Sequence, residues 1–245
     1  MNWIFGIHAV QSLLKSQPQR VKELQICRGR QNVRLQKLIA LAEQHNVAMQ
    51  WTTAKQLDAL VDGRHQGVAA LCTEGQAHDE TFLSELLEQR GQNCLLLMLD
   101  GVTDPHNLGA CLRSADGAGV QAVIVPRDNS VGLTPVVSKV ACGAAETVPL
   151  VAVTNLARTL RTLQQAGLWV VGTSGDADKT IYDTDLRGPM VMVMGAEGTG
   201  IRPLVRAQCD FLARLPMAGE VSSLNVSVAT GVCLFEAVRQ RNSVA

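Results

Sequence analysis

CLLLMLDGVTDPHNLGACLRSADGAGVQAVIVPR, residues 94–127, contains the pattern that indicates the fold class most clearly. Two compact apolar runs, CLLLMLDGV and QAVIVPR, flank a helix candidate, NLGACLRSADGAG. The alternation continues through the apolar runs VPLVAV, LWVVGTS and MVMVMG and the helix candidates TPVVSKVACGAA and NLARTLRTLQQAG. Near-continuous apolar strands that alternate with helices indicate a parallel sheet with helices on both faces. We therefore predict an α/β domain over residues 94–245.

The first 75 residues show a different pattern, which predicts a small α/β unit. Helical spacing occurs in IHAVQSLLK, RLQKLIALAEQHN and AKQLDALV, and strand-like runs occur in VKELQICRG, AMQWTT and GVAALCT. Residues 76–93 are polar and acidic with one short amphipathic piece, as expected of a linker. The predicted organisation is a small domain at 1–75, a linker at 76–93 and the larger domain at 94–245.

Composition limits the possible partners. The hydrophobic fraction of 47% is enough for a sizeable core, and the net charge is zero. Aromatic residues make up only 3%, so stacking platforms for single-stranded nucleic acid have little material. Residues 1–75 nevertheless carry nine Lys and Arg against five Asp and Glu. This excess is compatible with a solvated surface and equally with an RNA-facing patch.

Cysteine usage and hydropathy indicate the cellular compartment. The seven cysteines are scattered, mostly within apolar runs, and no CxxC pair occurs. Buried reduced thiols in a cytoplasmic protein fit this pattern better than a zinc site or a disulfide framework. The first residues lack a basic n-region, and no apolar run reaches the roughly 18 residues of a membrane span. We therefore expect a cytoplasmic protein without a metal or a membrane anchor.

Three loops that follow strands are the candidate sites, because ligands of parallel sheets bind beyond the carboxyl ends of the strands. In the first, residues 99–116, Asp100 ends a strand, Asn107 stands at an expected helix N-cap and Arg113 follows six residues later. A capped helix with an exposed arginine is the simple explanation of this loop by itself.

The second loop, VMVMGAEGTGI at residues 191–201, runs from a strand into three glycines with Glu197 between them. Glycines allow a ligand to approach the backbone closely. The spacing G-x-x-G-x-G differs from the dinucleotide-binding fingerprint, and no acidic residue ends a strand about twenty positions later. A dinucleotide oxidoreductase is therefore the weakest of the alternatives.

The third loop begins the stretch LPMAGEVSSLNVSVATGVCLFEAVRQR, residues 215–241. We expect Ser222 or Ser223 to cap a helix that begins near Leu224. That helix is apolar on most sides, which predicts burial, and one way to bury it is a subunit interface.

Together, NLGACLRSAD, VMGAEGTGI and LPMAGEVSSLNVSVA resemble the three motifs of the SpoU (TrmH-type) RNA 2′-O-ribose methyltransferases of the SPOUT superfamily. FGIHAVQSLL and the HQG at 65–67 resemble the small, L30e-like substrate-binding domain of many such enzymes. The resemblance covers nearly the whole chain. It implies S-adenosylmethionine as cofactor, a deep C-terminal trefoil knot, which is an exception among folds, and a homodimer with the active site at or near the interface.

The resemblance also implies a substrate and roles for individual residues. The overall likeness is greatest to members that methylate a guanosine in the peptidyl-transferase loop of 23S rRNA. Cofactor contact is implied for Gly195, Leu215, Met217 and Leu224. The polar motif positions implied in catalysis are Arg113, Asn107, Glu197, Ser223 and Asn225.

Physical chemistry narrows the roles of these polar residues. A guanidinium hardly loses its proton, so we expect Arg113 to grip an RNA phosphate and steady the developing 2′ oxyanion and not to act as a base. Asn107 and Asn225 are expected to orient the ribose or the loops. Glu197 is expected to fix Arg113 or the second loop, and Ser223 to combine a cap with substrate contact.

RNA affinity is expected from the N-terminal domain. The candidate phosphate contacts are Arg20, Lys22, Arg28, Arg30, Arg34 and Arg64. Two other functions stay open: methylation of tRNA ribose, and a non-catalytic RNA-binding factor in ribosome assembly.

Overall fold

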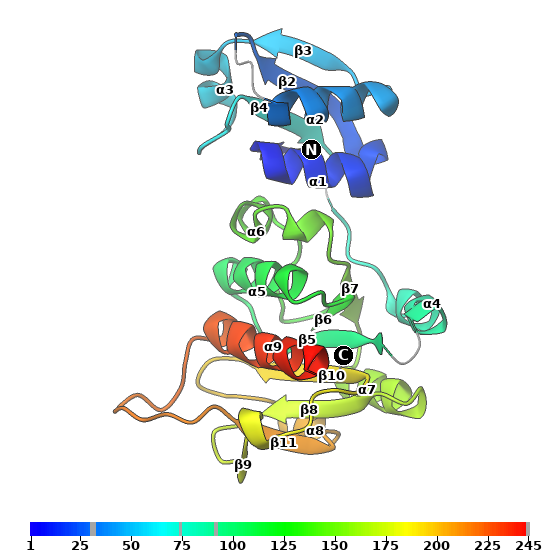
Figure 1. Cartoon of the computed structure of the whole chain (residues 1–245), viewed down its shortest axis with the longest axis vertical. Helices are drawn as coiled ribbons and strands as arrows, with labels where there is room; N and C mark the ends of the chain where they lie inside the picture. Colours follow the sequence, from blue (N-terminus) through cyan, green and yellow to red (C-terminus); the bar gives the residue numbers. More distant parts are fainter. Residues whose placement is uncertain (30–32, 74, 91–92, 244–245) are drawn as a thin grey trace. The chain divides into compact units, whose positions relative to one another are not determined.

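A computed structural model of the chain describes residues 1–29, 33–73, 75–90 and 93–243. The chain forms two compact units. The first contains Met1–Gln76 and Leu133–Thr147, and the second contains Ala77–Gly132 and Val148–Ala245. Figure 1 shows the elements of both units, and each unit is described by itself.

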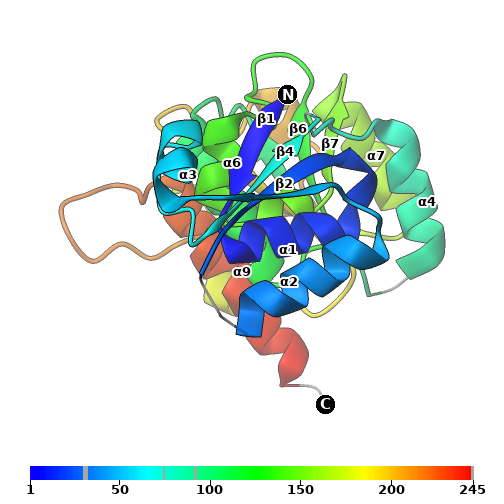
Figure 2. The ribbon, with the colours of Figure 1, turned by 90° about the horizontal axis from the view of Figure 1, so that it is seen from above.

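A mixed four-stranded sheet forms the centre of the first unit, in the order β1-β4-β2-β3. Strand β4 is antiparallel to both β1 and β2, whereas β2 and β3 are parallel. The helices α1 and α2 lie side by side (Figure 2) and bury apolar residues such as Leu13, Leu14 and Leu38. The elements are β1 (Asn2–Phe5), α1 (Ile7–Ser16), η1 (Pro18–Arg20), β2 (Val21–Cys27), α2 (Val33–Gln44), β3 (Met49–Thr52), α3 (Ala54–Leu60) and β4 (Val68–Cys72).

The segment 133–147 packs with this first unit, although its sequence follows the strand–helix pattern of the larger domain. Its helix α6 (Pro135–Ala141) contacts β1, and the 3-10 turn η3 (Ala144–Glu146) contacts α1. Arg20 donates a hydrogen bond from Nη1 to Glu146 Oε2 at 2.5 Å, and both side chains are largely buried, at 13% and 3% exposed. Burial raises the pKa of the Glu146 carboxyl, even though Arg20 acts in the opposite direction.

This ion pair corrects one expectation about RNA contacts. Arg20 also donates to the carbonyl oxygen of Thr73 and to Gln17 Oε1. Its guanidinium is therefore used inside the unit, and the prediction that Arg20 contacts RNA phosphate is wrong. Arg30 lies outside the described residues.

The second unit contains a seven-stranded sheet in the order β7-β6-β5-β10-β8-β11-β9. The neighbouring strands are parallel throughout these pairings, which confirms the predicted α/β class. The strands are β5 (Leu95–Asp100), β6 (Ala122–Pro126), β7 (Leu150–Val153), β8 (Trp169–Thr173), β9 (Lys179–Thr180), β10 (Met190–Gly195) and β11 (Phe211–Arg214). Residues of β5, β6 and β10 are almost completely buried, as their continuous apolar sequences require.

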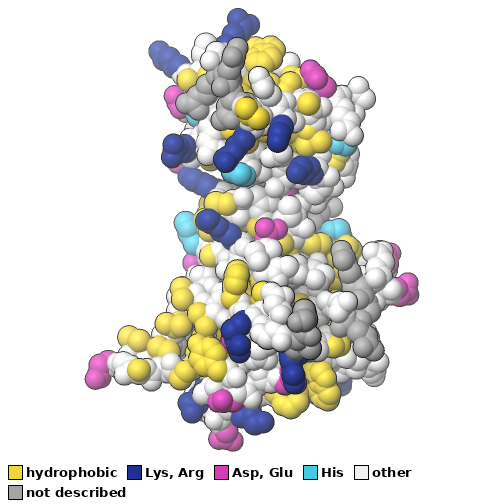
Figure 3. All heavy atoms as spheres, viewed as in Figure 1, with side chains coloured by type: hydrophobic (Ala, Val, Ile, Leu, Met, Phe, Trp, Pro, Cys, Tyr) yellow, Lys and Arg dark blue, Asp and Glu magenta, His cyan; other side chains and the backbone are white. Residues whose placement is uncertain are grey.

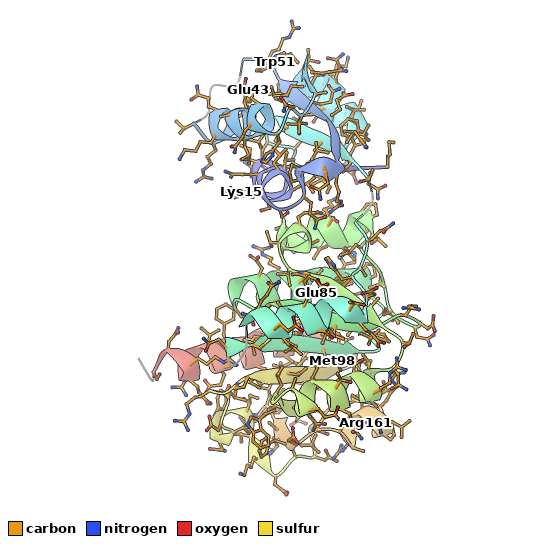
Figure 4. The ribbon with its side chains drawn as sticks, turned by 90° about the vertical axis from the view of Figure 1, so that its right-hand side faces the viewer. Lys15, Glu43, Trp51, Glu85, Met98 and Arg161 are labelled. Atoms are coloured by element: carbon orange, nitrogen blue, oxygen red, sulfur yellow. The ribbon has the colours of Figure 1, made fainter. Side chains whose placement is uncertain are left out.

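Helices cover both faces of this sheet. The helices are α4 (Glu80–Arg90), α5 (Pro105–Gly117), α7 (Leu156–Gln165), α8 (Pro203–Arg206) and α9 (Val226–Asn242), with the 3-10 turn η4 (Ile181–Asp183). Helices α5 and α9 pack against each other, and α9 also contacts β10. Figure 4 shows Glu85 of α4 and Arg161 of α7 in front of the strand that carries Met98.

Helix α4 occupies most of the segment predicted as a linker. Leu83 and Leu86 belong to the core of the second unit, and the helix contacts β7. Just before the helix, His78 donates its backbone N–H to the carbonyl of Leu150 at 2.8 Å. The acidic composition of the segment conceals this narrow apolar stripe, so residues 77–90 form a packed part of the unit.

Candidate functional site

The three loops named from sequence meet at the carboxyl ends of β5, β10 and β11. Asn225 donates from Nδ2 to Asn107 Oδ1 at 3.0 Å and to Glu197 Oε1 at 2.5 Å. Asn107 also donates from Nδ2 to Glu197 Oε1 at 3.4 Å. Each loop thus contributes one side chain to a single polar cluster, which joins positions 118 and 28 residues apart in sequence.

Asn225 is the N-cap of α9. Its Oδ1 accepts the backbone N–H of Ser227 at 2.9 Å, and the helix begins at Val226. The prediction that Ser222 or Ser223 caps this helix from a start near Leu224 is therefore wrong. Both serines are exposed in the preceding loop.

The cap of α5 also differs from the expectation. Asp104 is the N-cap, and its Oδ1 accepts the backbone N–H of His106 at 3.1 Å. Asn107 lies inside the first turn of the helix, where its side chain is available to the other two loops. Asp and Asn are equally good caps, and Pro105 at the first helical position decides between them.

A cavity of about 340 Å³ lies beside this cluster. Its walls include all four residues implied in cofactor contact, together with Glu197 and Ser223. The four are Gly195, Leu215, Met217 and Leu224. The volume lies in the range of small-molecule sites.

Gly195 is required by the turn that follows β10. A Cβ atom at this position would lie 2.1 Å from the carbonyl carbon of Gly200, so no side chain fits. Gly200 donates its N–H to the carbonyl of Ala196 at 2.8 Å, and its φ of 66° favours glycine. The glycines therefore allow the second loop to fold back on its own strand. This turn explains why glycine occurs at these positions, whereas the sequence analysis explained it by close approach of a ligand.

Asp100 anchors the base of the site. It is 1% exposed, and its two carboxylate oxygens accept from the backbone N–H and Nε of Arg202 at 2.8 and 2.6 Å. These bonds tie the end of β5 to the residues after the second loop. Asp100 is thus a structural member of the site.

The sequence did not single out the part of the cavity wall that follows β8. Thr173, Ser174 and Gly175 line the cavity, and so does Arg214 at the end of β11. The sequence could have indicated this part of the wall, because the apolar run LWVVGTS ends at the same edge of the sheet as the three chosen loops.

Arg113, like Asn107 and Asn225, does not line this cavity in its own chain. It is exposed on α5 and is absent from the residues that line the cavity. The side of α5 that faces α9 carries Cys111, whose Sγ donates to Thr230 Oγ1 at 3.5 Å, and Ser114, which lies beside Gly231. Arg113 lies on another side of the helix.

Helix α9 leaves part of its apolar surface uncovered. Val228 and Phe235 are 53% and 51% exposed, whereas Cys233 and Leu234 are fully buried. The expected burial on most sides therefore does not occur within one chain.

Most of the cysteines are buried, whereas Cys142 is exposed. All seven are free thiols, and burial raises the pKa of Cys111 to about 11 and that of Cys233 to about 12.

Within the part of the chain that the structure describes, no group of three His, Cys, Asp or Glu side chains suits a metal ion. No described helix is long and apolar enough to cross a membrane.

Comparison with known families agrees with this arrangement. The sequence model of the SpoU rRNA methylase family matches residues 94–235. This chain belongs to the SpoU rRNA methylase family. A second model, for the RNA 2′-O ribose methyltransferase substrate-binding domain, matches residues 3–77. The predicted family membership is thus confirmed for both domains.

Individual SpoU family members are similar along the whole chain. A 23S rRNA (guanosine-2′-O-)-methyltransferase RlmB from Pseudomonas putida is 63% identical over 97% of this chain and 96% of its own length. The RlmB of Escherichia coli is 56% identical over 98% of each chain. Among solved structures, the SpoU methyltransferase AviRb from Streptomyces viridochromogenes in complex with the cofactor AdoMet has a TM-score of 0.78 and 25% identity, covering 98% of this chain and 90% of AviRb.

Proposed function

We propose that this protein transfers a methyl group from S-adenosylmethionine to the ribose 2′-hydroxyl of a guanosine in 23S rRNA. The observation that carries the proposal is identity of 56–63% to 23S rRNA guanosine-2′-O-methyltransferases over nearly the whole chain. The polar cluster and cavity formed by the three motif loops agree with it. At finer detail, we propose a guanosine of the peptidyl-transferase loop as the target.

The cavity suits S-adenosylmethionine, which when bound supplies an electrophilic methyl group on a sulfonium. Leu215, Met217 and Leu224 provide apolar surface for an adenine ring. Backbone groups around Gly195 and Gly198 supply hydrogen-bonding partners without side-chain bulk. The Glu197 carboxylate on the cavity wall favours a cationic ligand.

The polar cluster holds the reacting groups in position. Glu197 Oε1 accepts hydrogen bonds from Asn107, Asn225 and the backbone N–H of Val226. This arrangement supports a role for Glu197 in fixing the loops. The two asparagines then orient the ribose, and Ser223, exposed on the cavity wall, contacts the substrate.

Arg113 acts in this proposal from a second copy of the chain. Its exposure and its absence from the cavity lining of its own chain are explained if a homodimer carries it to the partner's cavity. The exposed apolar residues Val228 and Phe235 on α9 and Val221 in the preceding loop supply an interface. There the guanidinium holds an RNA phosphate and stabilises the negative charge that develops on the 2′ oxygen.

The C-terminal region is proposed to form a trefoil knot. Strand β11 lies between β8 and β9 and not next to β10, and α9 then returns to contact β10 and α5. The segment before α9, drawn in orange in Figure 1, reaches out from the body of the second unit.

For the first unit, we propose an L30e-like fold that binds RNA. An rRNA substrate and seven free thiols favour the cytoplasm as the working compartment.

Methyl transfer to purified RNA tests the proposed function. The full chain is incubated with tritiated S-adenosylmethionine and, in separate reactions, a 23S rRNA transcript or total tRNA. Primer extension at low nucleotide concentration maps the modified ribose in the rRNA, and filter binding measures the affinity for each RNA. The proposal predicts one labelled guanosine. Label only in tRNA would favour the tRNA alternative, and binding without label would favour an assembly factor.

A further inference from the structure

Two short motifs of the first unit, FGIH at residues 5–8 and HQG at residues 65–67, meet in the folded chain. Gln66 Oε1 accepts the backbone N–H of Ile7 at 3.0 Å, so the HQG turn caps the start of α1. His65 is 8% exposed; its Nδ1 accepts the N–H of Gly67 at 3.0 Å, and its Nε2 lies 3.1 Å from Asp58 Oδ1. These bonds fix a turn in which Gln66 has a φ of 55°.

The fixed turn forms one wall of a cavity of about 390 Å³. Three exposed side chains that can bear positive charge line it, namely His8 of α1, Arg34 of α2 and Arg64 of the turn. Asp58 also lines it; its Oδ1 lies 3.1 Å from His65 Nε2, and its side chain is 68% exposed. Figure 3 shows Lys and Arg side chains gathered near a His on one face of this unit.

The chemistry of the lining indicates a nucleotide of RNA. Guanidinium groups bind phosphate oxygens in pairs, and the planes of arginine and histidine side chains stack on unpaired bases. The Oε1 of Gln66 is committed to α1, which leaves the amide Nε2 as a donor for a base or a 2′-hydroxyl.

We propose that the cavity lined by His8, Arg34, Arg64 and Gln66 binds a nucleotide splayed out of single-stranded RNA, with its phosphate between the two guanidiniums. This inference rests on the proposed function, because it makes the first unit the one that grips the substrate RNA. It adds a defined subsite to that role and separates Arg34 and Arg64 from the other basic residues of the unit.

The test compares two double variants of the full chain. Arg34→Ala/Arg64→Ala removes two cavity cations, and Lys15→Ala/Lys55→Ala removes two exposed cations that do not line the cavity. The probe is a fluorescein-labelled, 12-nucleotide single-stranded RNA of mixed sequence, whose binding is followed by fluorescence anisotropy at several salt concentrations. Circular dichroism checks folding, and calorimetry with S-adenosylmethionine checks the second unit.

The cavity variant should bind the RNA about tenfold more weakly, and the slope of log K against log salt should fall by about 0.7, as the loss of one neutralised phosphate requires. The lysine variant should keep the slope, and an RNA duplex of equal length should bind more weakly than the single strand. Equal losses in both variants, equal binding of duplex, or no measurable binding by the unaltered chain would overturn the inference. Because the probe is not 23S rRNA and no methyl transfer is scored, failure of the proposed methylation leaves this outcome unaffected.

Discussion

Glu197 illustrates how one residue joins three distant parts of the chain. Its Oε1 accepts from Asn107 on α5, from Asn225 before α9 and from the backbone of Val226. Sequence patterns identified these positions separately, and only folding brings them together. Arg113 differs from Glu197 at this scale, because it does not line the cavity of its own chain.

At the residue scale we predict that Arg113→Lys lowers kcat by about a hundredfold, since lysine cannot provide a planar, bidentate pair of donors. The binding of S-adenosylmethionine should stay unchanged, because the proposed partners of Arg113 are the RNA phosphate and the 2′ oxygen and not the cofactor. Single-turnover methylation of 23S rRNA and calorimetry measure the two effects. Near-normal turnover of the lysine variant would refute a bidentate guanidinium role.

At the element scale, the apolar strands of the second sheet were predictable, whereas the short elements β9 and α8, the packed helix α4 and the ends of the helices were not. Apolar runs such as MVMVMG have only one stable place, inside a covered parallel sheet. Caps depend on where the chain turns, so the sequence predicts Ser222 or Ser223 as the cap of α9 although Asn225 holds that position. The strand β1 was also missed, because its four residues directly precede a helix.

The cap of α9 yields a paired prediction. Asn225→Ala should lower the free energy of unfolding by about 1 kcal/mol through the lost cap, and it should also lower kcat, because the cluster with Asn107 and Glu197 is broken. Ser223→Ala should leave the melting temperature unchanged and affect turnover alone. Thermal unfolding and methylation assays separate the two. If Ser223→Ala lowered the stability and left turnover intact, the result would indicate that Ser223, and not Asn225, caps the helix.

The packing of η3 on α1 depends on a pair that no local pattern shows, since Arg20 and Glu146 are 126 residues apart. Arg20→Ala should cost about 3 kcal/mol, because it leaves a buried carboxylate without its partner. Burial already raises the pKa of Glu146. Without Arg20 this pKa rises further, so the deficit should grow as the pH increases and shrink in acid, where Glu146 is protonated in both states.

Urea unfolding of the Arg20→Ala variant at pH 5 and pH 8 measures this difference, with Arg28→Ala as the control at an exposed arginine of the same unit. A deficit equal to that of the control, or one that is larger in acid, would count against the buried pair.

At the scale of the whole molecule, the account requires a second copy of the chain to complete each site. Exposed Val228 and Phe235 on α9 provide an apolar surface that one chain leaves uncovered. A sequence can reveal such a surface as an apolar helix, but it cannot show whether another chain covers it.

Complementation between inactive chains tests this requirement. Arg113→Ala and Leu224→Arg should each abolish methylation, the second because it fills the cavity wall with a cation. Co-expressed in equal amounts, the two should recover about a quarter of normal activity, since half the dimers are mixed and each has one intact site. The same proteins purified separately and assayed without exchange serve as the control, and no recovery on co-expression would exclude sites shared between chains.

A crystal structure of the protein with S-adenosylmethionine tests the central claim most directly. The account predicts the ligand between residues 195–200 and 215–224, with its adenine against Leu215 and Leu224 and Arg113 of a second copy facing its methyl group. A ligand bound elsewhere, or Arg113 remote from the cavity in every pairing of chains, would contradict it.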